Sequence, residues 1–124
     1  MTKPLAIVFY ENLLPGSRLM NRLTDLGYRV QTVQMASMVR DTVRREKPIV
    51  LIADLALRNG DLCGVIRDLR GDPETSHVPI LGFANLSNQK VVDDAVSAGA
   101  NLVAADSGIL DQLPRLLDHV LALD

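Results

Sequence analysis

The chain has 124 residues, which is the size of one domain and enough to bury a core without disulfides or metal ions. Its formal net charge is -2, from 13 basic and 15 acidic residues, and this balance excludes the basic footprint that nucleic-acid binding needs. The single cysteine, Cys63, excludes an intrachain disulfide and a paired-cysteine zinc or redox motif.

Five short apolar segments alternate with helix-like segments, and we predict them to be strands: 5–9, 28–33, 49–53, 79–83 and 101–105. Three of them are continuously apolar, which is typical of parallel strands covered on both faces. The segment 28–33 alternates polar and apolar residues, as a half-exposed edge strand does.

Leucines at helical spacing predict a first helix after the first strand. Leu19, Leu23 and Leu26 form its apolar stripe, Pro15 suits its first turn, and Gly27 ends it.

A second helix is predicted before the third strand. Met35, Val39 and Val43 form its apolar stripe, and Lys47-Pro48 closes the segment. Three basic residues are expected on its exposed side: Arg40, Arg44 and Arg45.

Three further helices follow in the second half of the chain. Asp61 is the expected N-cap of the third helix, which ends at 71–73. Ser87 or Asn88 is expected to cap the fourth helix, over 89–99. The last helix is predicted over 111–123, with Pro114 in its first turn.

Strands that alternate with helices of this length imply right-handed crossovers. We therefore predict an α/β fold, a flavodoxin-like three-layer sandwich with a five-stranded parallel sheet in the order 2-1-3-4-5 and five helices. We expect residues 1–124 to form one domain with no output domain. The apolar run near the start is too short for a signal peptide or a membrane span, so we expect a cytoplasmic protein that makes no membrane contact.

Ligands of such sheets bind beyond the carboxyl ends of the strands, so the residues that follow each strand are informative. The residues read in this way are Tyr10, Glu11, Asp54, Ala84, Asn85 and Asp106. The three acids among them converge on one rim that has no lysine or arginine. Clustered carboxylates can hold Mg²⁺ or serve as acid and base, and the alternative is that they are solvated loop residues or caps.

Two stretches resemble the receiver domain of bacterial two-component response regulators: "KPIVLIADLALRNGDLCGVIRDLR" and "HVPILGFANLSNQKVVDDAVSAGANLV". The resemblance spans nearly the whole chain. It implies that Asp54 occupies the phospho-acceptor position and that Glu11 is one of the metal-binding acids, with Asp54 as a further Mg²⁺ ligand. It also implies that Ala84 replaces the switch Ser or Thr, Val103 the switch aromatic, and Asp106 the lysine.

The departures from the family pattern weaken phosphorylation. Tyr10 stands where the family has its first acid, and Asp106 stands where a lysine offsets the charge of the aspartyl phosphate. A phosphoryl group adds about -1.5 to -2 charges, and its transfer depends on cations. Ser107 follows Asp106 where the family has a proline, so we also expect a reshaped fifth loop. Without the hydroxyl and the ring, the usual two-state readout is missing. We expect a pseudo-receiver that acts by protein contact and is not an enzyme.

Three alternatives stay open at this stage. Asp54 still accepts phosphate, with Arg58 or Lys90 in place of the lysine; or Asp54 caps the loop that follows it. The third alternative is a flavodoxin-like module that binds a small molecule or cofactor. The segment after the first strand has only one glycine and a glutamate, which argues against a phosphate loop there. His77 and His119 are expected at the surface.

The family resemblance implies protein partners: a histidine kinase, a phosphotransfer protein or a downstream effector. In receivers, the face of the fourth helix, fifth strand and fifth helix mediates homodimers or effector contacts. Here this face would include Val91, Val92, Leu102, Leu110 and Leu113. Their helical spacing also fits core positions, so the sequence leaves open whether they are available for a partner or a homodimer.

Overall fold

The computed structural model describes residues 3–10, 13–57 and 60–121. Its centre is a parallel sheet with the strand order β2-β1-β3-β6-β7, which confirms the predicted order. The five strands are β1 (Leu5–Phe9), β2 (Arg29–Val33), β3 (Val50–Asp54), β6 (Ile80–Ala84) and β7 (Leu102–Ala105). Every residue of β1, β3 and β6 is buried, whereas the outer strands β2 and β7 are partly exposed.

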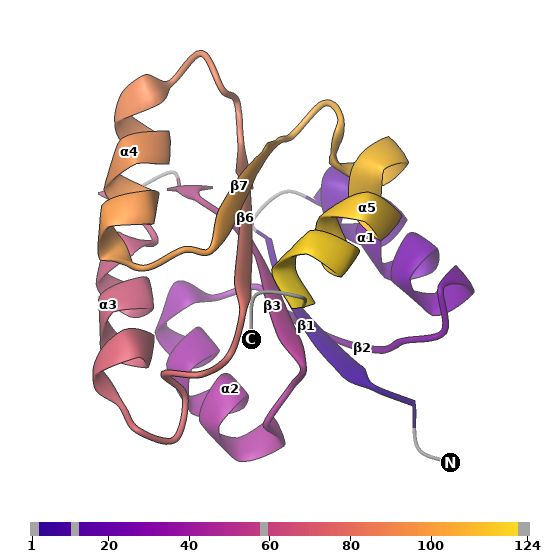
Figure 1. The fold of residues 1–124 in the computed structure, drawn as a ribbon, viewed down its shortest axis with the longest axis horizontal. Helices are drawn as coiled ribbons and strands as arrows, with labels where there is room; N and C mark the ends of the chain where they lie inside the picture. The colour runs from indigo at the N-terminus through magenta and orange to yellow at the C-terminus, as the bar shows by residue number, and fades with distance from the viewer. Residues whose placement is uncertain (1–2, 11–12, 58–59, 122–124) are drawn as a thin grey trace.

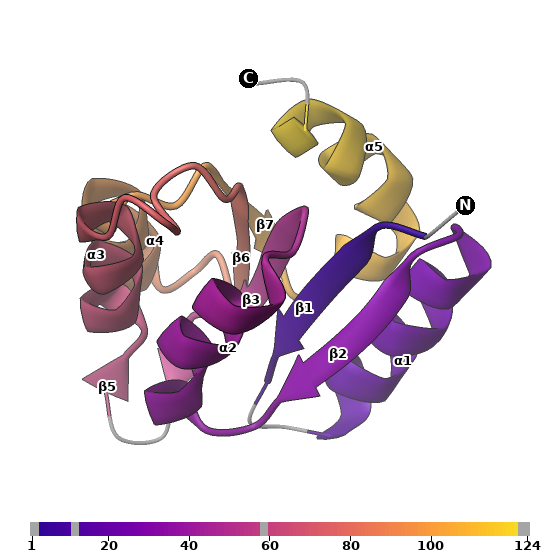
Figure 2. The same ribbon diagram turned by 90° about the horizontal axis from the view of Figure 1, so that it is seen from below.

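Helices cover both faces of this sheet, as predicted (Figures 1 and 2). The helices are α1 (Leu13–Asp25), α2 (Val39–Glu46), α3 (Cys63–Gly71), α4 (Gln89–Ala98) and α5 (Ile109–Leu121), with a short 3-10 helix, η1 (Ala36–Met38). One core cluster joins the sheet to α2, α3 and α4, and a second joins it to α1 and α5. Phe9 and Phe83, both fully buried, contribute to opposite clusters.

The ends of the first two helices follow from backbone conformation. Gly27, just after α1, has a φ of 95°, a region in which glycine has no steric penalty. Lys47 closes α2 with a φ of 50° and a ψ of 61°, the left-handed conformation in which a side chain is disfavoured. The positions predicted from sequence as helix ends are confirmed.

The expected stripe of the second helix is wrong at Met35. Val39 and Val43 are buried, but Met35 is 59% exposed. The turn between them is the 3-10 helix η1, which has three residues per turn. Met35 precedes this turn with an extended backbone (φ -121°, ψ 125°), so it does not share the helical face of the two valines.

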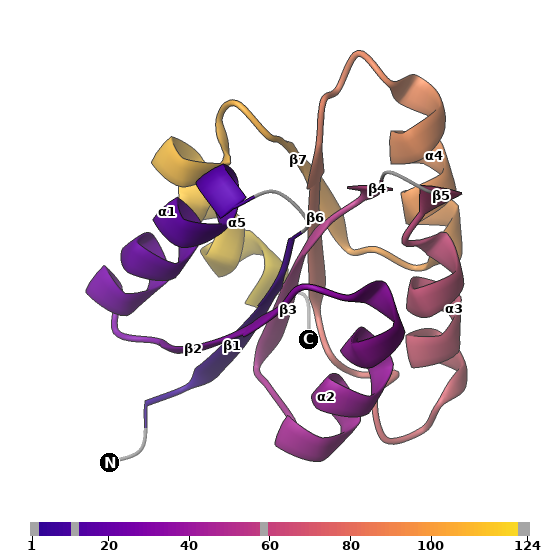
Figure 3. The same ribbon diagram turned by 180° about the vertical axis from the view of Figure 1, so that it is seen from behind.

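Two further sequence predictions are corrected near helix starts. Asp61 is not the N-cap of α3: it belongs to β5 (Gly60–Asp61), and Leu62 holds the N-cap position without a side-chain bond. β5 pairs antiparallel with β4 (Ala56–Leu57) in a two-stranded ribbon that the sequence did not predict (Figure 3). α5 begins at Ile109, two residues before the predicted start, so Pro114 lies in its second turn.

Arg70, at the end of α3, donates hydrogen bonds to several segments at the amino-terminal edge of the sheet. Its Nε donates to the Gly99 carbonyl at 2.9 Å, and its Nη1 donates to the carbonyls of Ser76 and Val78 at 2.7 and 2.8 Å. Its Nη2 donates to Oδ1 of Asn101 at 2.6 Å. Burial lowers the pKa of Arg70. The guanidinium thus links α3, the loop before β6 and the connection from α4 to β7.

Candidate functional site

The candidate site lies where β1, β3, β6 and β7 end, because parallel strands bring their carboxyl ends to one edge of the sheet. Asp54 is the last residue of the central strand β3 and is only 7% exposed. Its register partner on β6 is Phe83. The strand of Asp54 therefore has a neighbouring strand on each side, and Asp54 is buried at the carboxyl end of the sheet.

The residue after Asp54 fixes the course of the chain. The Leu55 amide donates to the Phe83 carbonyl at 3.1 Å, which extends the contact between β3 and β6. The Leu55 side chain packs against the backbone of Gly82, where a Cβ would lie 2.7 Å from Cδ1 of Leu55. Only glycine leaves this space, so Gly82 positions the loop that follows Asp54.

Tyr10 occupies the position where the family resemblance places an acid. It is 4% exposed and packs in the core cluster beneath α1 and α5. Its amide donates to the Val33 carbonyl at 3.2 Å, and its hydroxyl accepts from Nε2 of Gln34 at 3.4 Å. At the position where the resemblance predicts a first metal-binding carboxylate, the chain thus has a buried ring.

Glu11, the second acid predicted at this rim, lies outside the described residues. Within the part of the chain that the structure describes, no group of three His, Cys, Asp or Glu side chains could hold a metal ion. The predicted pair Glu11 and Asp54 therefore stays a prediction.

Ala84 and Val103 occupy the two predicted switch positions. Ala84 is 3% exposed and belongs to the core cluster under α2, α3 and α4. Val103 is half-buried and packs against that same cluster. Both side chains are therefore committed to apolar packing on one face of the sheet.

Asp106 follows β7, and its amide donates to the Ala84 carbonyl at 3.0 Å. Its side chain is exposed. Phe83 pairs with Ala104 as well as with Asp54, so Asp106 lies two strands across and two residues beyond Asp54. Strand spacing and rise then separate the two Cα atoms by about 12 Å. The two aspartates therefore lie at the same edge of the sheet, but their short side chains are too far apart to touch.

Lys90 and Arg58 are the two basic residues that could replace the lysine, and the structure describes only Lys90. Nζ of Lys90 lies 2.8 Å from Oδ2 of Asp94, one turn further along α4. Arg58 lies outside the described residues. His77 and His119 are exposed, as predicted, and Cys63 is buried at the start of α3.

Gln34 is a residue at this rim that was not predicted from the sequence. Gln34 directly follows β2 and holds the Tyr10 hydroxyl. The signal was present, because the rule of reading the residue after each strand applies to the second strand as well. No helix in the described ranges is both long and apolar enough to cross a membrane.

No family model and no curated protein matches the sequence. Solved structures that it resembles include response regulators and the receiver domain of a sensor histidine kinase, and the fold is the CheY-like receiver fold. A Chloroflexus aurantiacus protein assigned as a response regulator is 21% identical with a TM-score of 0.89, over 98% of this chain and 99% of that one.

Two other receivers are similar over their full length. The receiver domain of sensor histidine kinase PA1611 from Pseudomonas aeruginosa, which has a magnesium ion in its active site cleft, is 21% identical with a TM-score of 0.88, over 98% of this chain and 99% of that one. Chemotaxis protein CheY4 of Vibrio cholerae is 16% identical with a TM-score of 0.86, over 97% of this chain and 100% of that one.

Proposed function

We propose that this chain is a receiver-like module of two-component signalling that acts through protein contacts, with phosphorylation of Asp54 weakened or lost. One observation carries the proposal: a receiver fold in which a buried aspartate ends the central strand while Ala84 and Asp106 stand at the switch and lysine positions. The fold supports the signalling class. The rim residues support the loss of regulation by phosphate.

The missing cation matters more than repulsion from Asp106. The Cα atoms of Asp54 and Asp106 are about 12 Å apart and the Asp106 side chain is exposed, so solvent weakens its repulsion of a phosphoryl group on Asp54. A lysine in direct contact would act at about 4 Å, where attraction is strongest. Its loss removes the charge compensation on which phosphoryl transfer depends.

The packing of Ala84 and Val103 supports a module without the usual switch. Ala84 has no hydroxyl to bond a phosphoryl oxygen, and Val103 has no ring whose position could report one. Both pack against the same core cluster, which supports apolar packing as the role of these two positions.

Magnesium binding is part of the proposal only in weakened form. The PA1611 receiver has Mg²⁺ in its cleft. In this chain Asp54 would supply a carboxylate ligand, Glu11 a second, and the buried Tyr10 ring removes a third. With fewer carboxylate ligands, we expect binding weaker than in receivers that keep all three acids.

The partners that fit this proposal are proteins: a histidine kinase, a phosphotransfer protein or a downstream effector. We further propose that the chain has no catalytic activity of its own and works in the cytoplasm, the latter from its single cysteine. Co-purification of a tagged chain, with the Asp54→Asn variant alongside, would test whether partner binding is independent of Asp54.

The direct test is incubation of the chain with Mg²⁺ and a small phosphodonor or beryllofluoride, read by intact mass and two-dimensional NMR. We expect no Asp54-dependent modification and only local shifts. The Ala84→Thr, Asp106→Lys double variant should gain modification, and adding Asp54→Asn should abolish that gain. Stoichiometric modification of the unaltered chain at Asp54, with widespread shifts, would contradict the proposal.

A further inference from the structure

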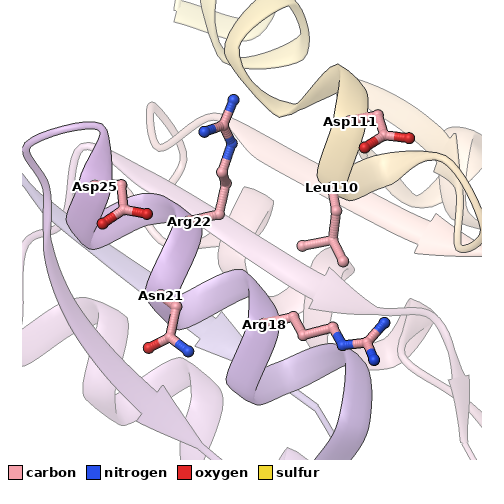
Figure 4. A pocket seen from close by; sticks show the side chains of 6 residues that line it. All are labelled: Arg18, Asn21, Arg22, Asp25, Leu110 and Asp111. Carbon is pink, nitrogen blue, oxygen red and sulfur yellow. The ribbon is translucent and has the colours of Figure 1, made fainter.

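A groove of about 530 Å³ lies between α1 and α5 (Figure 4). Six residues line it: Arg18, Asn21, Arg22, Asp25, Leu110 and Asp111. The first four come from α1 and the last two from the start of α5. The groove is therefore polar along α1, and half-buried Leu110 supplies an apolar wall.

The four α1 residues form one seam, because positions i, i+3, i+4 and i+7 share a face of a helix. Arg18, Asn21 and Asp25 are exposed and Arg22 is half-buried. No described acid lies within 4.0 Å of either guanidinium, so neither arginine has an ion-pair partner among the residues that the structure describes. Two cations and one anion thus lie along one helix face with no ion pair to any residue within 3–10, 13–57 and 60–121.

This seam is complementary to itself when a second copy lies antiparallel to it. A twofold axis between Asn21 and Arg22 sets Arg18 opposite the partner's Asp25, and Arg22 opposite the partner's Asn21. A shift of one turn would instead set Arg18 opposite the partner's Arg22, a like-charge contact. A shift of one turn the other way would set Arg22 opposite the partner's Asp25, but Arg18 would then lie beyond the end of the partner's α1. Of these three registers, only the first pairs Arg18 with an acid and overlaps the whole seam.

We propose that a second copy of the chain binds in this groove. The two copies form a homodimer in which their α1 helices pack antiparallel and α5 lines the groove. Arg18 and Asp25 are about 10.5 Å apart along the helix axis, so the two symmetric pairs bracket the contact. Antiparallel helices pack about 8–10 Å apart, a distance that an arginine and an aspartate span together.

A small anion fits the groove less well than a second copy. Asp25 and Asp111 line the same groove as the two arginines, so the lining has no net charge. A free anion would meet two carboxylates. A second copy instead presents a cation to Asp25 and an acid to Arg18, which uses both signs of charge.

The pairs of this dimer are exposed, so the association is weak and sensitive to salt. The inference does not depend on the chemistry of Asp54 and goes beyond the proposed signalling function. The groove shares Leu110 with the predicted α4, β7 and α5 surface, whose residues are all half-buried or buried, but its paired charges lie on α1.

The test is sedimentation velocity of the full chain at low and high ionic strength. We expect a monomer–dimer equilibrium at low salt that shifts to monomer at high salt. Arg18→Asp or Asp25→Arg alone should weaken association about tenfold or more, because each sets like charges opposite. The combined variant carries both changes, exchanges the signs and should restore the dimer. Arg67→Asp, at an exposed position on α3, should leave association unchanged.

Circular dichroism and thermal unfolding of each variant establish that it is folded. A chain that stays monomeric at low salt overturns the proposal. So does a dimer that neither single variant weakens, since it would form through another face. A combined variant that is folded and does not recover association also overturns the proposed pairing.

Discussion

Replacement of Arg70 by methionine should destabilise the fold by about 2–3 kcal/mol. Methionine keeps the aliphatic stem that packs against Gly99, where a Cβ would lie 2.6 Å from Cγ of Arg70. It removes all four hydrogen bonds of the guanidinium. Those to the Gly99 and Val78 carbonyls, at 2.9 and 2.8 Å, are partly buried. Each is a bond from a charged donor, worth about 1.5–3 kcal/mol.

The remaining two bonds, to the Ser76 carbonyl and to Asn101, are exposed and contribute little. Relief of the desolvation that lowers the pKa of Arg70 offsets part of the loss. The expected loss of stability, about 2–3 kcal/mol, is therefore well below the full value of four charged hydrogen bonds.

Urea unfolding at neutral pH measures this change as a lower midpoint with an unchanged slope. Arg67→Met, on the same helix at an exposed position, is the matched control and should cost less than about 0.5 kcal/mol. Arg70→Lys should fall between the two, because an ammonium cannot serve acceptors spread across the fork of a guanidinium. A loss below about 1 kcal/mol for Arg70→Met, or one equal to that of the control, would refute the reasoning.

Three smaller effects follow from other residues. Lys47→Gly should raise the unfolding free energy by about 0.5–1 kcal/mol in urea titration, since Lys47 has a φ of 50°; a decrease would contradict this. Asn88→Ala should lower it by only about 0.5 kcal/mol, because the cap bond is 3.5 Å long, and a loss above about 2 kcal/mol would show another role. Burial, and then Asp118, raise the pKa of Tyr28 above 10.0, so the unfolded chain loses that proton first and stability falls as pH rises through this range. Tyr28→Phe should flatten the fall, measured by thermal unfolding between pH 9 and about 11; an unchanged slope would exclude Tyr28 as its source.

Strand positions were accessible from sequence because the pattern of apolar residues reflects burial. The continuous apolar runs at 5–9 and 49–53 correspond to strands that are buried at every position. The alternating run at 28–33 became the edge strand β2, with only Val33 fully buried. In each case a local pattern reports directly on how many faces of the strand are covered.

Helix starts were harder to predict because they depend on where the preceding segment goes. Asp61 has the residue type of an N-cap, but the ribbon of β4 and β5 holds its backbone in a strand. Met35 fits a stripe of helical period, yet a 3-10 turn separates it from Val39. Neither the ribbon nor the tighter turn leaves a distinct pattern of residue types.

For the candidate site, the sequence predicted the residue types but not their contacts. Its residue types, an aspartate at one strand end with an alanine and a second aspartate at two others, are read from the sequence alone. The sequence did not reveal that the Tyr10 hydroxyl would be bonded by Gln34, or that Leu55 would pack on Gly82. Both contacts join residues from neighbouring strands, so they exist only once the sheet has formed.

By itself, then, the sequence determined where the strands lie and which groups stand at each strand end, because both follow from local periodicity and spacing. The strand order followed from the rules that govern connections between parallel strands. Only the tertiary structure decided the contacts. It set Asp106 two strands from Asp54, committed Ala84 and Val103 to one core cluster, and placed the α1 seam beside Leu110. Distances between segments far apart in the chain depend on register and packing, which no single segment encodes.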